Sequence, residues 1–171
     1  GIISAVRRPP ADVENRETGK IERVDYGFVG DIKGVNIEPL KTLIDAGYVP
    51  VVSSLAADDA GQVLNVNADT VATKIAIAIG ATKYCVLTTV DGVMGRVDDP
   101  STLFSVLTIT EAQRLFESDS VSGGMLPKLS TCIDVLKGGV PKVHIINGAR
   151  PDTLLLEVFT NEGCGTLITK E

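Results

Sequence analysis

The sequence has 171 residues, of which 44% are apolar, 22% charged and 4% aromatic, as in an ordinary α/β domain. Its formal net charge is −6 and no Lys/Arg cluster follows a predicted helix face, which argues against a nucleic acid partner. No apolar run approaches the ~20 residues that cross a bilayer, and no signal peptide opens the chain. We therefore expect a cytoplasmic protein with no membrane partner.

Cysteine and histidine usage argues against two further kinds of site. Cys85, Cys132 and Cys164 are widely spaced and form no C-x-x-C pattern, so we expect buried, reduced thiols. His144 is the single histidine and lies in the apolar run 142–146, which favours a strand residue over a ligand. A zinc site or a Ser-His-Asp triad therefore has little support.

The first 35 residues are predicted to be rich in β-structure. Residues 2–7, 20–24 and 28–35 have strand patterns, and the polar residues 11–20 are expected to form a mobile loop. Because no helix separates these strands, we expect them to be antiparallel and peripheral.

From Asn36 onward the pattern predicts helices that alternate with strands. The expected elements are a helix capped by Asn36 and ending at 46, a strand at 48–53, a helix from Asn67 to Gly80, a strand at 84–89, a helix at 111–118 capped by Thr110, a helix at 127–137 opened by Pro127, a strand at 142–147, a helix at 152–160 and a strand at 166–169. This alternation predicts an α/β protein, a three-layer αβα fold with a mainly parallel sheet. We expect one domain over residues 1–171.

A first candidate site precedes the helix that starts after Asn67. Asn65, Asn67 and Asp69 are spaced by two on an extended segment, so they can share one face. Asn67 is also well placed to cap the helix, because its side-chain oxygen can accept free backbone N–H groups. A cap with solvated polar neighbours therefore explains the pattern as well, although three carboxamide or carboxylate groups in five residues favour a function.

A second candidate site follows the strand at 84–89. It contains Thr88, Thr89, Asp91 and Gly92. Parallel α/β units bind ligands at the carboxyl ends of their strands, so this loop could contact a nucleotide. A plain turn with Asp-Gly chemistry explains the same residues equally well.

A third candidate site is a loop that ends where a helix starts. It contains Val121, Ser122, Gly123, Gly124 and Met125, and Lys128 follows in the first helical turn. Free N–H groups, the helix dipole and a lysine would make a phosphate-binding corner. The loop matches neither the P-loop nor G-x-G-x-x-G. Spacing alone slightly favours a helix–helix connection followed by a surface lysine.

Together, five segments resemble the amino acid kinase family, in that family's order and over nearly the whole chain. They are YGFVGDI (26–32), VLNVNADTVA (63–72), LTTVDGV (87–93), SGGMLPK (122–128) and LLLEVFTNEGCGTLI (154–168). The first and fourth segments favour the family's acetylglutamate branch over its uridylate, aspartate and glutamate 5-kinase branches.

The resemblance implies ATP-dependent phosphorylation of the side-chain carboxylate of N-acetyl-L-glutamate, a step of arginine biosynthesis, with Mg²⁺ accompanying ATP. By the family's motifs, Asn65 and Asn67 would bind the acid, and Asp69 would hold the catalytic lysines in position. Lys128 would stabilise charge on the transferring phosphoryl group. Residues 88–94 and 120–125 would hold the nucleotide. A carboxylate nucleophile is already ionised at pH 7, so no general base is needed.

The chain also departs from the family pattern. The family's amino-terminal half, with its first catalytic lysine, has no counterpart, so the chain resembles the carboxy-terminal, nucleotide-binding half. We expect these 171 residues to be inactive alone, and the full-length enzyme to be a homo-oligomer. Thr89 stands where the family usually has Asp, and Asp91 follows two residues later. Another amino acid kinase, or a non-catalytic nucleotide-binding or regulatory module, is the alternative.

Overall fold

The computed structural model describes residues 1–15, 18–96, 99–118, 124–160 and 163–171. They form two compact units, Gly1–Ile75 and Ala76–Glu171. The elements are β1 (Ile3–Arg7), β2 (Ala11–Glu14), β3 (Ile21–Val24), β4 (Gly30–Val35), α1 (Glu38–Asp45), β5 (Leu55–Ala57), β6 (Val63–Asn65), α2 (Ala68–Ile79), β7 (Tyr84–Thr88), a 3₁₀ turn η1 (Pro100–Thr102), β8 (Val106–Thr108), α3 (Ile109–Glu117), α4 (Met125–Lys137), β9 (Lys142–Asn147), α5 (Thr153–Phe159) and β10 (Thr166–Thr169). The predicted α/β class is confirmed. That residues 1–171 form one domain stays a prediction.

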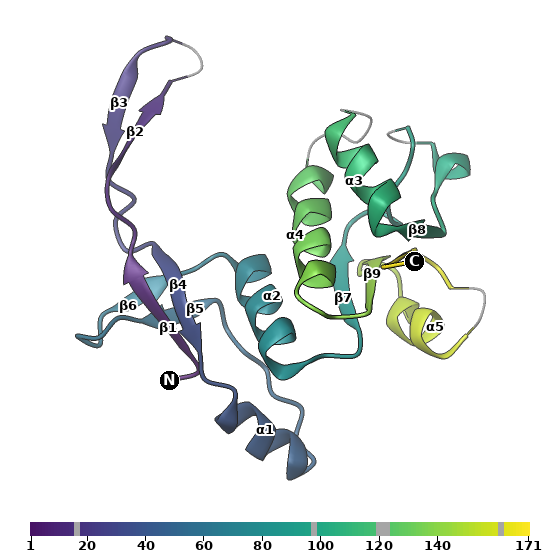
Figure 1. Cartoon of the computed structure of the whole chain (residues 1–171), viewed down its shortest axis with the longest axis horizontal. Coiled ribbons are helices and arrows are strands. Elements are labelled where there is room, and N and C mark those ends of the chain that lie inside the picture. The colour runs from purple at the N-terminus through teal and green to yellow at the C-terminus, as the bar shows by residue number, and fades with distance from the viewer. Residues whose placement is uncertain (16–17, 97–98, 119–123, 161–162) are drawn as a thin grey trace. The chain divides into compact units, whose positions relative to one another are not determined.

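The first unit is built on a four-stranded sheet in the order β4-β1-β5-β6 (Figure 1). Strand β1 pairs antiparallel with β4 and parallel with β5, and β5 pairs antiparallel with β6. The expected antiparallel pairing of the opening strands is thus confirmed, but the expected peripheral position is wrong for β1, which lies between β4 and β5. The apolar core of this unit consists of Ile3, Ala5, Ala56, Leu64, Val66 and Val71.

A two-stranded hairpin extends from this sheet (Figure 1). Its strands β2 and β3 pair antiparallel, with Ala11 opposite Val24 and Asp12 opposite Arg23. The mobile loop expected over residues 11–20 is therefore wrong for residues 11–14. Those four residues are exposed, so they show no buried face for a periodicity argument to detect, and their backbone pairing supplies the order.

Helix α1 and the segment after it differ from the prediction. Its N-cap is Ile37, one residue later than predicted, although the Asn36 side chain still accepts a hydrogen bond from the Glu38 amide at 3.2 Å. The strand expected at 48–53 is wrong. Val49 and Val51 are 88% and 96% exposed, and within the described part of the chain no strand pairs with this extended segment.

Helix α2 begins in the first unit, ends in the second and confirms both predicted ends. The Asn67 side chain accepts the Thr70 amide at 2.9 Å. At the other end Gly80 has φ +66°, and the Ala81 amide donates to the Ala76 carbonyl at 2.9 Å. This is the wrapped backbone bond that a left-handed residue after a helix allows.

The second unit is built on a four-stranded sheet in the order β7-β9-β10-β8. Strand β9 is parallel to β7 and antiparallel to β10, which is parallel to β8. Helices α4 and α5 contact β9, and α3 packs against α4 and β8 (Figure 1). Every residue of β9 except Lys142 is buried. The sheet is mixed, with parallel neighbours in two of its three pairings.

Boundaries in the second unit match the predictions closely, with two exceptions. Strands β9 and β10 agree residue for residue, β7 is one residue shorter, and α5 is one residue shorter at each end. Helix α3 is capped by Thr108 rather than Thr110, in a capping box with Glu111. Helix α4 begins at Met125, two residues before Pro127. Among the described helices, none is long and apolar enough to cross a bilayer.

Candidate functional site

The predicted acid-binding residues lie at the amino end of α2, in the first unit. Asn65 ends β6, and its amide donates to the Phe28 carbonyl at 2.8 Å. Its side chain and that of Asn67 are exposed, and Asp69 is half-buried in the first turn of α2. The Asn67 side-chain oxygen is occupied by Thr70. The observed role of Asn67 is to cap α2, and these hydrogen bonds also set the orientation of its side-chain amide nitrogen.

The loop after β7 lies in the second unit, at the carboxyl ends of the parallel strands β7 and β9. Thr88 is half-buried and opposite Asn147 in the register, and Thr89 is exposed. The side chain of Asp91 accepts a hydrogen bond from Asn147 Nδ2 at 2.8 Å and forms an ion pair with Arg150 at 2.8 Å. The loop is therefore tied to the chain that follows β9.

Gly92 in this loop has a steric reason to be glycine. Thr166 Oγ1, on β10, accepts the Val93 amide at 2.8 Å in a fully buried contact. A Cβ on Gly92 would lie 2.5 Å from that oxygen and 2.9 Å from a methyl group of Leu103. A side chain would therefore break the hydrogen bond that holds the loop to the sheet.

The third predicted site is partly described. Gly124 is the exposed N-cap of α4, Met125 is the first helical residue, and Lys128 is half-buried one turn in. Val121, Ser122 and Gly123 lie outside the described residues. The positive end of a 13-residue helix and a lysine are thus placed together, as a phosphate site requires.

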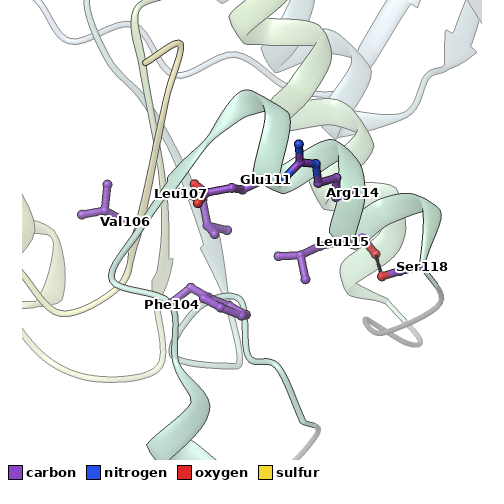
Figure 2. A pocket seen from close by; sticks show the side chains of 7 residues that line it. All are labelled: Phe104, Val106, Leu107, Glu111, Arg114, Leu115 and Ser118. Carbon is purple, nitrogen blue, oxygen red and sulfur yellow. Dashed lines mark hydrogen bonds between the residues drawn. The ribbon is translucent and has the colours of Figure 1, made fainter.

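A pocket of about 320 Å³ lies between β8 and α3 (Figure 2). It is lined by Phe104, Val106, Leu107, Glu111, Arg114, Leu115 and Ser118. Figure 2 shows Phe104, Leu107 and Leu115 around the same space, which gives the pocket apolar walls. The Phe104 amide donates to the Val93 carbonyl at 2.9 Å. The pocket is thus joined to the loop after β7, and Ser118 stands just before residues 119–123.

The sequence did not predict this pocket. Its walls come from residues 104–107 and from α3, which ordinary packing accounts for when the sequence is considered alone. The one available signal was the Thr108-x-x-Glu111 capping box, which places the start of α3 and hence the face carrying Leu115.

A buried polar cluster occupies the same unit. His144 Nδ1 lies 2.7 Å from Glu157 Oε1, and the Cys164 amide donates to Glu157 Oε2 at 2.7 Å. Burial raises the pKa of the Glu157 carboxyl, but the hydrogen bonds from His144 and Cys164 outweigh it and leave that pKa below its usual value. His144 is therefore a strand residue in a hydrogen-bonded polar cluster, as the sequence favoured. Its Nε2 is buried without a partner among the described residues.

None of the three cysteines forms a disulfide. Cys132 is buried, whereas Cys85 and Cys164 are half-buried. Desolvation raises the pKa of both half-buried thiols, and the nearby Glu157 carboxylate raises it further. Both are therefore weak nucleophiles.

The described residues are better suited to binding a nucleotide than to enclosing a metal ion. An apolar pocket suits a base, and the amino end of α4 with Lys128 suits phosphate. No group of three or more His, Cys, Asp or Glu side chains in the described ranges could hold a metal ion. Asp91 is already engaged by Asn147 and Arg150.

An α/β fold with a strand-end loop and a lysine after a helix start is the arrangement expected of a phosphate-binding α/β protein. The chain belongs to the amino acid kinase family, whose model matches residues 2–147.

Two curated relatives with similar sequences share one name within this family. A protein named acetylglutamate kinase from Symbiobacterium thermophilum is 48% identical over 170 residues, which are 99% of this chain and 56% of that relative. Another of that name, from a Nostoc species, is 52% identical over 142 residues, 83% of this chain and 48% of that relative. The chain spans about half the length of these curated relatives.

Solved structures agree on the fold. N-acetylglutamate synthase from Neisseria gonorrhoeae, solved with coenzyme A and L-arginine, has a TM-score of 0.82 and 30% identity, over 99% of this chain and 37% of that one. Carbamate kinase from Giardia lamblia bound to citric acid has a TM-score of 0.64 and 17% identity, over 95% and 51% of the two chains. The second likeness concerns the fold alone.

Proposed function

We propose that this chain supplies the nucleotide-binding part of a cytoplasmic acetylglutamate kinase, which transfers a phosphoryl group from ATP to the side-chain carboxylate of N-acetyl-L-glutamate in arginine biosynthesis. The observation that carries the proposal is the 48–52% identity to relatives of that name. The pocket beside the loop after β7, and the lysine at the start of α4, support it independently.

The second unit would bind the nucleotide. Its base would enter the apolar pocket between Phe104 and Leu115, and residues 88–94 and 120–125 would hold the sugar and phosphates. The phosphates would point to the amino end of α4, where Lys128 would stabilise charge that grows as the phosphoryl group transfers. Mg²⁺ would be bound mainly by the phosphates and water, which suits its preference for substrate oxygens.

The first unit would contribute to the acid site. The side chain of Asn65 is exposed and would bind the acylamino acid, with Asn67 beside it. Asp69 would hold the catalytic lysines in position. The acid's own carboxylate is the nucleophile and is ionised at neutral pH, so alignment and charge stabilisation are sufficient.

The relatives are about twice as long as this chain. The rest of the enzyme would therefore supply the first catalytic lysine and most of the acid pocket. We also propose that the full-length enzyme assembles as a homo-oligomer.

An acyl-phosphate assay on the full-length protein tests the proposal. Hydroxylamine traps an acyl phosphate as a hydroxamate, so ATP and a panel of acids should yield hydroxamate with N-acetyl-L-glutamate. Aspartate and free glutamate should give little. Product from another acid alone would make the protein a different amino acid kinase. Nucleotide binding without any product would make it a non-catalytic module.

A further inference from the structure

One cationic side chain that the sequence did not single out lies at the ends of the parallel strands. Strands β7 and β9 end together, with Thr88 opposite Asn147. The Gly148 amide donates to the Thr88 carbonyl at 2.8 Å, so the pairing continues one residue further. Arg150 follows two residues later. It therefore stands at the edge where parallel α/β sheets bind their ligands.

Both carboxylate oxygens of Asp91 are already engaged at this edge. Oδ1 accepts from Asn147 Nδ2 at 2.8 Å, and Oδ2 lies 2.8 Å from Nη2 of Arg150. The Asp91 side chain is 20% exposed, whereas that of Arg150 is 62% exposed. Asp91 thus faces protein groups, while the guanidinium that it holds faces solvent.

Asn147 orients Asp91 from the buried side. Its Oδ1 accepts the Ala149 amide at 2.9 Å, which leaves Nδ2 to face Asp91. Its backbone carbonyl accepts Thr153 Oγ1 at 2.8 Å, so the residue is also anchored to the start of α5. A carboxylate held in this way presents a guanidinium in one place before any ligand arrives.

We propose that Asp91 is a positioning residue and that Arg150, which it holds, binds a phosphate of the nucleotide. Asp91 then acts through Arg150 and does not contact the nucleotide itself. The proposal rests on the proposed function for the presence of a nucleotide. One guanidinium nitrogen contacts Asp91, and the described residues give the other two no partner. A planar guanidinium matches a phosphate with two parallel N–H donors, and its prior positioning lowers the entropy cost of binding.

The test compares the dissociation constants of ATP and adenosine for the full-length protein, by competition calorimetry in Mg²⁺. Arg150→Gln should weaken ATP about tenfold and leave adenosine unchanged, because adenosine has no phosphate. Arg150→Lys keeps the charge, so its dissociation constant for ATP should lie between those of the wild type and Arg150→Gln. Asp91→Asn retains an acceptor for Asn147 but loses the ion pair, so it should weaken ATP about threefold, again without an effect on adenosine.

Arg23→Gln is the matched control. Arg23 is an exposed arginine that pairs with Asp12 at 3.5 Å on the β2–β3 hairpin, so its loss should change neither constant. Equal weakening of ATP and adenosine by Arg150→Gln, or no effect on either, would overturn the proposal and leave a structural ion pair. Weaker adenosine binding in Asp91→Asn would mean that Asp91 contacts the nucleoside itself, which would also overturn the proposal.

The measurement needs no acid turnover, so it separates this inference from the proposed function. A protein that binds ATP but phosphorylates no acid would refute the proposed function and leave the Arg150 comparison decisive. A protein with no affinity for ATP would overturn both.

Discussion

Lys128 is the side chain whose charge the proposed reaction needs most. Lys128 lies one turn into α4, where its ammonium would face the phosphates of the proposed nucleotide. Lys128→Ala in the full-length enzyme should lower kcat roughly a hundredfold, about 3 kcal/mol of transition-state stabilisation, with a much smaller change in KM. Steady-state kinetics decides this. Lys137→Ala, an exposed lysine in the last turn of the same helix, should have no effect. An unchanged kcat for Lys128→Ala would remove that residue from the mechanism.

Glu157 gives a pH dependence with a definite sign. Its folded pKa is below the ordinary 4.5, so its stabilising contribution is present above about that pH and is lost as the pH falls through the folded pKa. Urea unfolding between pH 7 and pH 3 should therefore show an acid loss that is shallower in Glu157→Gln. At pH 7 that variant should be roughly 1–3 kcal/mol less stable, because it weakens a buried hydrogen bond to His144 and a part-buried one from the Cys164 amide.

The control for this experiment is Glu117→Gln, which removes an exposed carboxylate from α3. Glu117→Gln should leave the free energy of unfolding at pH 7 nearly unchanged. Parallel acid curves for the wild type and Glu157→Gln would mean that the His144–Glu157 contact does not govern the acid limb.

At the scale of elements, prediction succeeds where local signals coincide. Helix α2 has a cap, a periodic apolar face and a terminal glycine, and all three predict the helix that is observed. Strand β9 is a continuous apolar run, and its burial accounts for that composition. Each of these elements is specified by its own residues.

Prediction fails where an element depends on a partner. Residues 48–53 have strand composition but no paired strand in the described chain, whereas β2 has little strand composition and pairs well. The predicted cap of α3, Thr110, is wrong because β8, which ends at Thr108, was not expected. The composition of a segment indicates its propensity to form a strand, whereas its pairing with another strand depends on the tertiary structure.

The loop after β7 yields a prediction that depends on two elements. Gly92→Ala would place a methyl group against Thr166 and Leu103, so it should cost roughly 1–3 kcal/mol of stability and raise KM for ATP several-fold. Gly80→Ala is the matched control. Gly80 also has positive φ, +66°, but no atom lies within 4 Å of the place that its methyl group would take. It should cost about 1–2 kcal/mol of stability and leave KM for ATP unchanged. Equal KM values for both variants would show that the Val93–Thr166 contact does not shape the nucleotide site.

At the scale of the molecule, the sequence motifs identify residues of the candidate site but not the contacts that join them. Asn65, Asp69 and Lys128 could be named from family segments. The contacts that shape the proposed nucleotide site join residues far apart in the sequence, 73 positions for Val93 to Thr166 and 56 for Asp91 to Asn147. No local pattern encodes such pairs, and for this reason the pocket and Arg150 emerged only from the fold.

The first unit carries an exposed apolar surface. Val51, Leu55 and Val63 are exposed and line one hollow of this unit. Clustered apolar side chains of this kind promote association. We expect the 171-residue chain to self-associate, and Val51→Lys to reduce that association in sedimentation velocity over a concentration series. Ile21→Lys, at an exposed position on the hairpin, should not. A wild-type chain that is monomeric throughout would contradict the prediction.

The most direct test of the proposed nucleotide site is a calorimetric titration of ATP·Mg²⁺ into the 171-residue chain itself. The second unit holds the pocket, the loop after β7 and Lys128, but the proposed first catalytic lysine would come from elsewhere in the enzyme. We predict saturable binding with a dissociation constant in the high micromolar to millimolar range, roughly −4 to −6 kcal/mol. No binding at millimolar ATP would contradict the claim that this chain carries the nucleotide site, and nanomolar binding would contradict the claim that it carries only part of it.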